Sequence, residues 1–170
     1  PVLAVGPTAN WGGKQWPAER FAEAVARLTA PDGILPDARI AVFGGQAERE
    51  AATPLLDSIP PARRLDLVGG PGLAEVAACL GRAALYIGND SGLMHVAAAA
   101  GIPTLGLFGP SPEALYAPWG PRAAVLRTPE SYEALVGAPG FDYRGQRSLM
   151  TGLTVDAVVQ AATALWEKQS

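Results

Sequence analysis

Short apolar runs alternate with longer amphipathic stretches along nearly the whole chain, and this alternation indicates repeated strand–helix units. The apolar runs predict six strands, at residues 2–5, 39–43, 64–68, 84–87, 104–108 and 123–127. Strands that alternate with helices through short loops pair in parallel and bury both faces under helices. The pattern therefore predicts an α/β fold with a doubly wound, Rossmann-like parallel sheet.

The stretches between the strands predict helices, because apolar residues recur there every three or four positions. We expect Pro17 at the first position of the first helix, where its missing N–H costs nothing. Thr154 is expected as the N-cap of the last helix, which runs to residue 166. Other helices are expected at about 47–57, 73–80, 91–100 and, as one turn, 113–116. Residues 131–149 have no clean period, so we assign no element there.

Length and composition are typical of a globular protein, since 49% of the 170 residues are hydrophobic and 17% are charged. We expect one domain over residues 1–170, and we expect it to be a segment of a longer polypeptide because Pro1 leads directly into a strand. No apolar run approaches the roughly 18 residues of a membrane-spanning helix. A net charge of −3 without a basic block argues against nucleic acid as a partner. Cys79 is the one cysteine, which fits a reducing compartment, and we expect it to be a buried inert thiol.

The loops that leave the strands are rich in glycine and polar residues, at 6–14, 44–48, 69–72, 88–92 and 109–111. In open parallel sheets, ligands bind outside the carboxyl ends of the strands, near the point where the strand order reverses. The informative residues therefore gather at one edge of the sheet.

Residues 88–110 predict a strand, a tight turn, an Ala-rich helix and a second strand. Such a turn presents unpaired backbone N–H groups and the positive end of a helix dipole, which together favour a phosphate. Ser91 and Gly92 are the phosphate candidates, because Gly92 has no side chain to block the backbone. Asp90 is interpreted either as the cap of this helix or as a partner for ligand hydroxyls, since a carboxylate repels a diphosphate.

Three further positions have a functional and a structural interpretation. Lys14 is either a solvated lysine or the charge that neutralises a diphosphate, with Thr8 and Asn10 as neutral donors beside it. Glu48 either favours the start of its helix or accepts two ribose hydroxyls. His95 is either a packed core residue or part of the site, one turn beyond Ser91 on the same face.

Several other kinds of site are disfavoured. A single histidine without a nearby cysteine or a convincing carboxylate partner is a poor metal ligand, so we expect no metal. The first loop, GPTANWGGKQWP, is too long for the G-x-G-x-x-G pattern of a nicotinamide dinucleotide fold. A nucleoside-triphosphate phosphate loop is excluded because Lys14 is followed by Gln15.

Three motifs carry a family resemblance. Residues 87–95 read IGNDSGLMH, with AAA at 97–99 and LFGP at 107–110. They resemble the D-[TS]-G-x-x-H-x-A-A and x-F-G-P signature of glycosyltransferase family 9, the ADP-heptose:lipopolysaccharide heptosyltransferases. Residues 10–17, NWGGKQWP, are similar to that family's K-x-W-P loop, and residues 44–48, GGQAE, to its G-G-x-x-[ED] segment.

The resemblance implies one half of a GT-B enzyme, in which two Rossmann-like domains face each other across a cleft. The chain resembles the C-terminal, donor-binding domain. The resemblance places the general base, an acidic residue, on an N-terminal acceptor-binding domain outside this chain. It implies that Lys14 and Ser91–Gly92 hold the donor diphosphate, that Glu48 holds the ribose, and that the loop Gly70–Leu73, with Pro71, flanks the adenine. Asp90 and His95 would lie beside the sugar or the phosphates.

The implied activity is an inverting transfer of heptose from ADP-heptose to a lipopolysaccharide-core acceptor, without a metal or other cofactor. The implied partners are an ADP-sugar donor and a glycolipid acceptor that binds through the missing domain. The implied location is the cytoplasm, with peripheral association at the inner face of the inner membrane also allowed. Two alternatives stay open. One is a non-catalytic nucleotide-sugar binding module, and the other is a UDP-sugar GT-B enzyme such as an epimerase.

Overall fold

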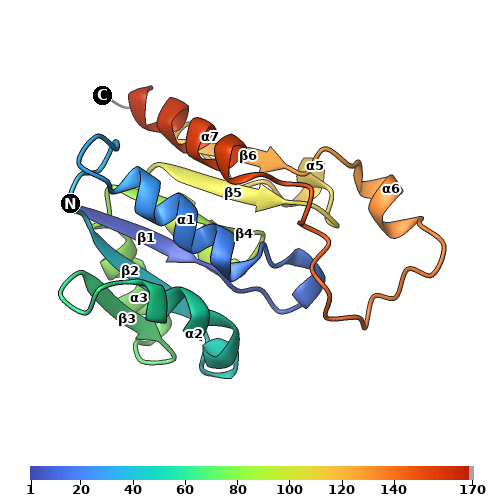
Figure 1. Ribbon diagram of the computed structural model, residues 1–170, viewed down its shortest axis with the longest axis horizontal. Coiled ribbons are helices and arrows are strands. Elements are labelled where there is room, and N and C mark those ends of the chain that lie inside the picture. Colours follow the sequence, from blue (N-terminus) through green and yellow to red (C-terminus); the bar gives the residue numbers. More distant parts are fainter. Residues whose placement is uncertain (169–170) are drawn as a thin grey trace.

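The computed structural model describes residues 1–168, which fold around a six-stranded, all-parallel sheet with the strand order β3-β2-β1-β4-β5-β6 (Figure 1). The chain moves outward in one direction from β1 to β3, then returns to the centre and moves outward in the other direction from β4 to β6. The order therefore reverses between β1 and β4, which pair through residues such as Gly6 and Gly88. The strands are β1 (Val2–Gly6), β2 (Arg39–Gly44), β3 (Arg64–Val68), β4 (Leu85–Asn89), β5 (Thr104–Phe108) and β6 (Ala123–Arg127).

Helices cover both faces of the sheet, which confirms the doubly wound α/β fold. One face packs against α1 (Ala18–Leu28), α2 (Arg49–Ser58) and α7 (Val155–Glu167). The other packs against α3 (Leu73–Leu80) and α4 (Gly92–Ala99). The period of two along each strand divides the core accordingly, since Leu3 and Val5 of β1 face the first layer and Ala4 faces the second.

The predicted elements agree closely with the observed ones. Strands β3, β5 and β6 have the predicted bounds, whereas β1, β2 and β4 extend one or two residues further into the glycine-rich loops. The hydroxyl of Thr154 accepts a hydrogen bond from the Ala157 amide, which confirms it as the N-cap of α7. The predicted helix at 47–57 is a short 3-10 helix, η2 (Gln46–Glu48), followed by α2.

Two predictions were wrong. Pro17 is the N-cap of α1 rather than its first helical residue, because its extended ψ of 134° places it outside the helix. Cys79 is exposed, not buried, because it faces solvent while Val76 and Leu80 of the same helix face the core.

Residues 131–149 are mostly irregular, as expected, apart from the short helix α6 (Tyr132–Val136). The single helical turn expected at 113–116 is the short helix α5 (Glu113–Tyr116). The segment that follows α6 returns to the first loop and fastens it. The Trp11 indole N–H donates to the Gly145 carbonyl at 2.8 Å, and the Leu149 amide donates to the Gly13 carbonyl at 3.0 Å. A segment without sequence periodicity therefore braces the loop that carries Lys14.

Among residues 1–168, no helix combines the length and the apolar character needed to cross a bilayer.

Candidate functional site

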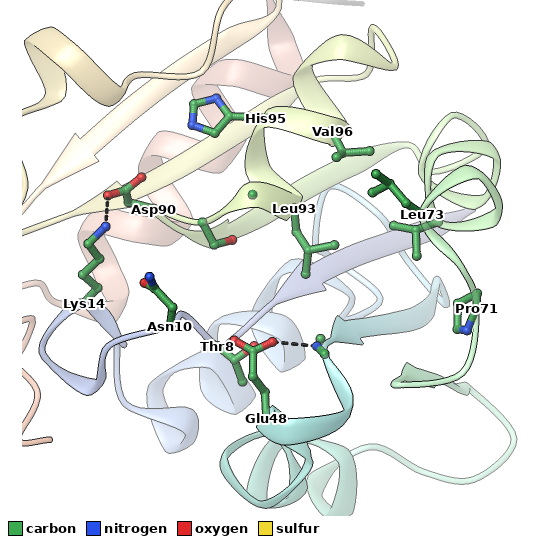
Figure 2. A pocket seen from close by; sticks show the side chains of 15 residues that line it. Thr8, Asn10, Lys14, Glu48, Pro71, Leu73, Asp90, Leu93, His95 and Val96 are labelled. Atoms are coloured by element: carbon green, nitrogen blue, oxygen red, sulfur yellow. Dashed lines mark hydrogen bonds and ion pairs between the residues drawn. The ribbon is translucent and has the colours of Figure 1, made fainter.

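A cavity of about 710 Å³ opens at the carboxyl edge of the sheet, over the ends of β1 and β4 where the strand order reverses (Figure 2). Four segments far apart in the sequence form its walls. They are the loop after β1, the turn after β2, the loop and first turns of α3, and the first turns of α4. The lining residues are Thr8, Asn10, Lys14, Gly44, Gly45, Glu48, Pro71, Leu73, Val76, Asp90, Ser91, Gly92, Leu93, His95 and Val96.

All nine residues that the sequence singled out line this one cavity: Thr8, Asn10, Lys14, Glu48, Pro71, Asp90, Ser91, Gly92 and His95. Parallel strands explain the convergence, because their carboxyl ends reach the same edge of the sheet. The part that each residue plays in binding stays a prediction.

Lys14 and Asp90 form the main charged contact of the cavity. The Lys14 ammonium lies 2.7 Å from Oδ2 of Asp90, and the two side chains are 24% and 6% exposed. Lys14 is the last residue of the short 3-10 helix η1 (Gly12–Lys14), whereas Asp90 directly follows β4. The Tyr116 ring centroid lies 5.9 Å from the same ammonium, within the range of a cation–π contact. The ion pair fixes the Lys14 ammonium beside the start of α4.

Asn89 holds the Lys14 loop against β4, a role that was not predicted from the sequence. Its buried side chain accepts a hydrogen bond from the Trp16 amide at 3.0 Å and donates to the Pro7 carbonyl at 2.8 Å. These bonds fix both ends of the loop to the end of β4. Its position beside Asp90 was the available clue, but an Asn in a strand–helix turn usually serves the turn itself.

The N-terminus of α4 has no side-chain cap. Ser91 occupies the N-cap position, but its hydroxyl makes no capping hydrogen bond, and Asp90 pairs with Lys14 instead of capping the helix. The capping interpretation of Asp90 is therefore wrong. A Cβ added to Gly92 would meet no atom within 4 Å, so the backbone is open to the cavity. Uncapped first-turn N–H groups beside a lysine form a favourable place for an anion.

Glu48 stands on the opposite side of the cavity from His95 (Figure 2). Its Oε2 accepts a hydrogen bond from the Gly45 amide at 2.6 Å, so the carboxylate is held by its own turn. An added Cβ on Gly44 would lie 3.2 Å from the Thr8 hydroxyl oxygen and 3.5 Å from Glu48 Oε2. The Thr8 hydroxyl and this carboxylate therefore face the same point of the turn after β2.

His95 is exposed and lines the cavity, so its interpretation as a packed core residue is wrong. Met94, its neighbour, takes the core position. The wall between α3 and α4 is apolar, and its side chains are Leu73, Val76, Leu93 and Val96. Leu73 ends the loop that the resemblance placed beside the adenine, whereas the other three had no expected role. Leu73 is 71% exposed, although large apolar side chains seldom face water without a partner.

Buried hydroxyls lie at and below the cavity floor. The oxygens of Thr8, Tyr86 and Ser91 are inaccessible to solvent and have no hydrogen-bond partner among the described residues. Burial strongly raises the pKa of the Tyr86 phenol, the nearby Ser91 hydroxyl lowers it in part, and the Glu48 charge raises it further. Tyr86 is therefore a neutral phenol throughout the physiological pH range.

Among residues 1–168, no group of three or more His, Cys, Asp or Glu side chains is arranged to hold a metal ion.

Comparison with known proteins gives a consistent result. The family model for glycosyltransferase family 9 (heptosyltransferase) matches residues 1–137. Lipopolysaccharide heptosyltransferase 2 of Escherichia coli is 27% identical over 169 residues, which are 97% of this chain and 47% of that protein. The chain thus spans about half the length of this curated relative.

Two solved structures have the same fold. The structure of E. coli ADP-heptose lipopolysaccharide heptosyltransferase II superposes with a TM-score of 0.80 at 24% identity, over 99% of this chain and 47% of that one. An E. coli heptosyltransferase solved with ADP superposes with a TM-score of 0.73 at 23% identity, over 96% of this chain and 44% of that one.

Proposed function

This chain belongs to glycosyltransferase family 9, and we propose on that basis that it is the donor-binding half of an inverting heptosyltransferase that uses ADP-heptose. The observation that carries the proposal is the cavity at the strand-order reversal. There Lys14, the uncapped start of α4 and Glu48 surround a volume of about 710 Å³. Bound ADP in a structure of the same fold supports the choice of nucleotide.

The diphosphate fits the side of the cavity formed by β1 and β4. The Lys14 ammonium supplies the positive charge, and the open backbone at Gly92 supplies N–H donors at the positive end of the α4 dipole. Asp90 holds Lys14 from one side at 2.7 Å and leaves its other hydrogens for phosphate oxygens. Asp90 itself accepts hydrogen bonds from sugar hydroxyls, which do not repel a carboxylate as phosphate oxygens do.

The nucleoside fits the side formed by β2 and α3. Glu48 faces the cavity next to the turn after β2 and accepts the ribose hydroxyls, as acidic residues do in related nucleotide folds. The adenine packs against Pro71 and the apolar wall of α3 and α4, where it covers exposed apolar surface such as Leu73. His95 lies beside the donor sugar.

Transfer follows from this arrangement. An acceptor hydroxyl attacks the anomeric carbon, a carbon–oxygen bond forms with inversion, and the bond to the diphosphate breaks, so that ADP leaves. Lys14 and the α4 terminus stabilise the charge that develops on the leaving diphosphate. Asp90 is paired with Lys14 and Glu48 with Gly45, so the proton of the acceptor goes to a base on the other half of the protein.

Calorimetric titration with ADP, UDP, GDP and NAD tests the nucleotide. We expect ADP to bind and UDP and GDP to bind at least about ten-fold more weakly, because adenine is the base proposed to pack against Pro71 and the apolar wall. NAD carries the same adenine and diphosphate, so its affinity tests whether a second nucleoside is accepted where the donor sugar is proposed to lie. A preference for UDP would favour an epimerase-like enzyme over our proposal. Equal affinity for all four ligands would mean that the cavity recognises the diphosphate and not the nucleobase.

A transfer assay with ADP-heptose and a lipopolysaccharide-core acceptor tests the division of labour. We expect the 170-residue chain to bind donor and to transfer no sugar, since the acceptor wall and base lie elsewhere. Turnover by this chain alone would place the base within it and contradict our domain assignment.

A further inference from the structure

The strand order around the cavity arranges the parts of the proposed donor in a row. The nucleoside is proposed on the side of β2 and α3, and the diphosphate at the ends of β1 and β4. The next strand in the same direction is β5. Because parallel strands all end at the same edge of the sheet, the segment that leaves β5 is the next wall beyond the diphosphate. The transferred sugar is joined to the second phosphate and therefore extends towards this segment.

The segment that leaves β5 carries a half-exposed tyrosine. It runs through residues 109–112 into α5, which lies beside the carboxyl ends of β5 and β6 (Figure 1). Tyr116 is the last residue of α5 and is 49% exposed. Its ring centroid lies 5.9 Å from the Lys14 ammonium, which also lies 2.7 Å from Oδ2 of Asp90. One lysine thus contacts both this aromatic ring and the carboxylate proposed to bind the sugar.

Arg127 of β6 supports the helix that carries the tyrosine. Its guanidinium donates hydrogen bonds to the Glu113 carboxylate at the start of α5 and, at 2.9 Å, to the Gly109 carbonyl just beyond β5. The Tyr116 amide in turn donates to the Pro112 carbonyl at 3.2 Å. The ring is therefore presented by a supported turn at a fixed place beside Lys14, and not by a free loop.

A tyrosine ring at this place suits a sugar better than it suits a phosphate. The ring offers a flat apolar face, and its phenol oxygen can donate or accept a hydrogen bond. A pyranose has C–H bonds on its faces and hydroxyls around its edge. Stacking on the ring covers the C–H face and leaves the hydroxyls free for a carboxylate such as that of Asp90.

We propose that Tyr116 is a sugar-contacting residue, whose ring is the platform on which the pyranose of the donor stacks beside Asp90. The inference rests on the proposed function and deepens it, because it names a residue that distinguishes the nucleotide-sugar from the nucleotide alone. ADP lacks the transferred sugar, so Tyr116 contributes more to the affinity for ADP-heptose than to the affinity for ADP.

The test titrates the unmutated chain, Tyr116→Ala and Tyr116→Phe with ADP and with ADP-heptose in a calorimeter. The readout is the ratio of the ADP-heptose affinity to the ADP affinity, in which any effect that acts through Lys14 cancels. We expect Tyr116→Ala to lower this ratio about five-fold, as the loss of one aromatic contact does. Tyr116→Phe keeps the ring and should keep the ratio within about two-fold. Leu115→Ala, on the same helix and 76% exposed, is the matched control and should leave the ratio unchanged.

Proton NMR with ADP-heptose tests the contact itself. We expect nuclear Overhauser effects between the ring protons of one tyrosine and the ring protons of the heptose. In Tyr116→Phe, which retains an aromatic ring and so leaves α5 undisturbed, these signals should disappear from the tyrosine spectrum. Signals from a different tyrosine, or none from any tyrosine, would overturn the proposal.

The outcomes separate this inference from the proposed function. If the unmutated chain binds neither ADP nor ADP-heptose, the proposed function fails and the sugar platform fails with it. If ADP binds and Tyr116→Ala lowers both affinities by the same factor, Tyr116 acts only through Lys14, and this inference alone is overturned. An equal fall of the ratio in Leu115→Ala would likewise overturn it, because the effect would then belong to α5 as a whole.

Discussion

The two sides of the cavity hold their charges by different means. On the side of β1 and β4, Lys14 and Asp90 are 76 residues apart and are joined by an ion pair, while Asn89 and the segment that follows α6 brace the loop from outside. On the side of β2 and α3, the Glu48 carboxylate accepts a hydrogen bond from the Gly45 amide, only three residues away.

In the proposed binding mode, this difference predicts which part of the donor nucleotide is held rigidly. Long-range contacts between packed segments resist local opening, whereas short-range turns with exposed side chains such as Leu73 open more easily. We infer that the diphosphate side is formed before ligand binding and that the nucleoside side adapts. The following predictions test this contrast, in order of decreasing effect.

Asn89→Ala should produce the largest loss of stability, because it leaves the Trp16 amide and the Pro7 carbonyl buried without their partner. We expect a loss of about 3 kcal/mol in the free energy of unfolding, measured by urea titration. Asn10→Ala, at an exposed position of the same loop, is the matched control and should change stability little. Similar effects of the two variants would show that Asn89 does not brace the loop.

Lys14→Met should weaken ADP binding by about ten-fold or more, since it removes the charge beside the diphosphate and leaves Asp90 unpaired. The loss should be larger at low salt than at high salt, because mobile ions screen the attraction in the native chain. The control is Lys168→Met, the loss of an exposed lysine just beyond α7. An affinity independent of Lys14 at every salt concentration would contradict the electrostatic account.

Glu48→Ala should weaken ADP binding by a smaller factor, about three-fold, because an adaptable side of the cavity contributes less. The loss should disappear with 2′,3′-dideoxy-ADP, which lacks the hydroxyls that Glu48 is proposed to accept. Glu50→Ala, exposed at the start of α2, is the matched control. An equal loss with both nucleotides would show that Glu48 acts only through its turn.

The smallest expected effect is a pH dependence at the outer edge of the nucleoside side. Arg49 lies 2.6 Å from Asp66, and this hydrogen bond lowers the pKa of the Asp66 carboxyl. A lowered native pKa stabilises the fold at pH values above the unfolded pKa, and this contribution is lost as pH falls through the native pKa. Thermal melts should show Asp66→Asn less stable than the unchanged chain at pH 7, with the difference closing below about pH 4. A difference that stays constant with pH would mean that the Asp66 charge contributes nothing.

The sequence was sufficient for the fold because the strands of a parallel sheet are short apolar runs, and most of these runs lead into glycine-rich loops. It was also sufficient to predict that the nine cavity residues lie together, since each lies in a loop after a strand or near the start of a helix at the carboxyl edge of the sheet. The pairing of Lys14 with Asp90 was not predictable, because no local pattern says which segments meet across the sheet. The contacts of residues 145–149 with the first loop were not predictable for the same reason, because the backbone hydrogen bonds of an irregular segment leave no periodic pattern in its sequence.

The helix faces show the same limit at single residues. Cys79 and His95 lie on short Ala-rich helices, where small side chains blur the boundary between the buried and exposed faces. Both proved to be exposed. Val76, Leu93 and Val96 of the apolar wall were missed because apolar residues near helix starts are usually assigned to the core.

A crystal structure of the chain with ADP tests the central claim most directly. We expect the diphosphate within hydrogen-bond distance of Lys14 Nζ and the Gly92 amide, with Lys14 still paired to Asp90 and the ribose beside Glu48. Little movement is expected in residues 7–16, whereas residues 70–73 should shift to cover the adenine. Phosphates bound away from Lys14 and Gly92 would contradict the proposed donor site.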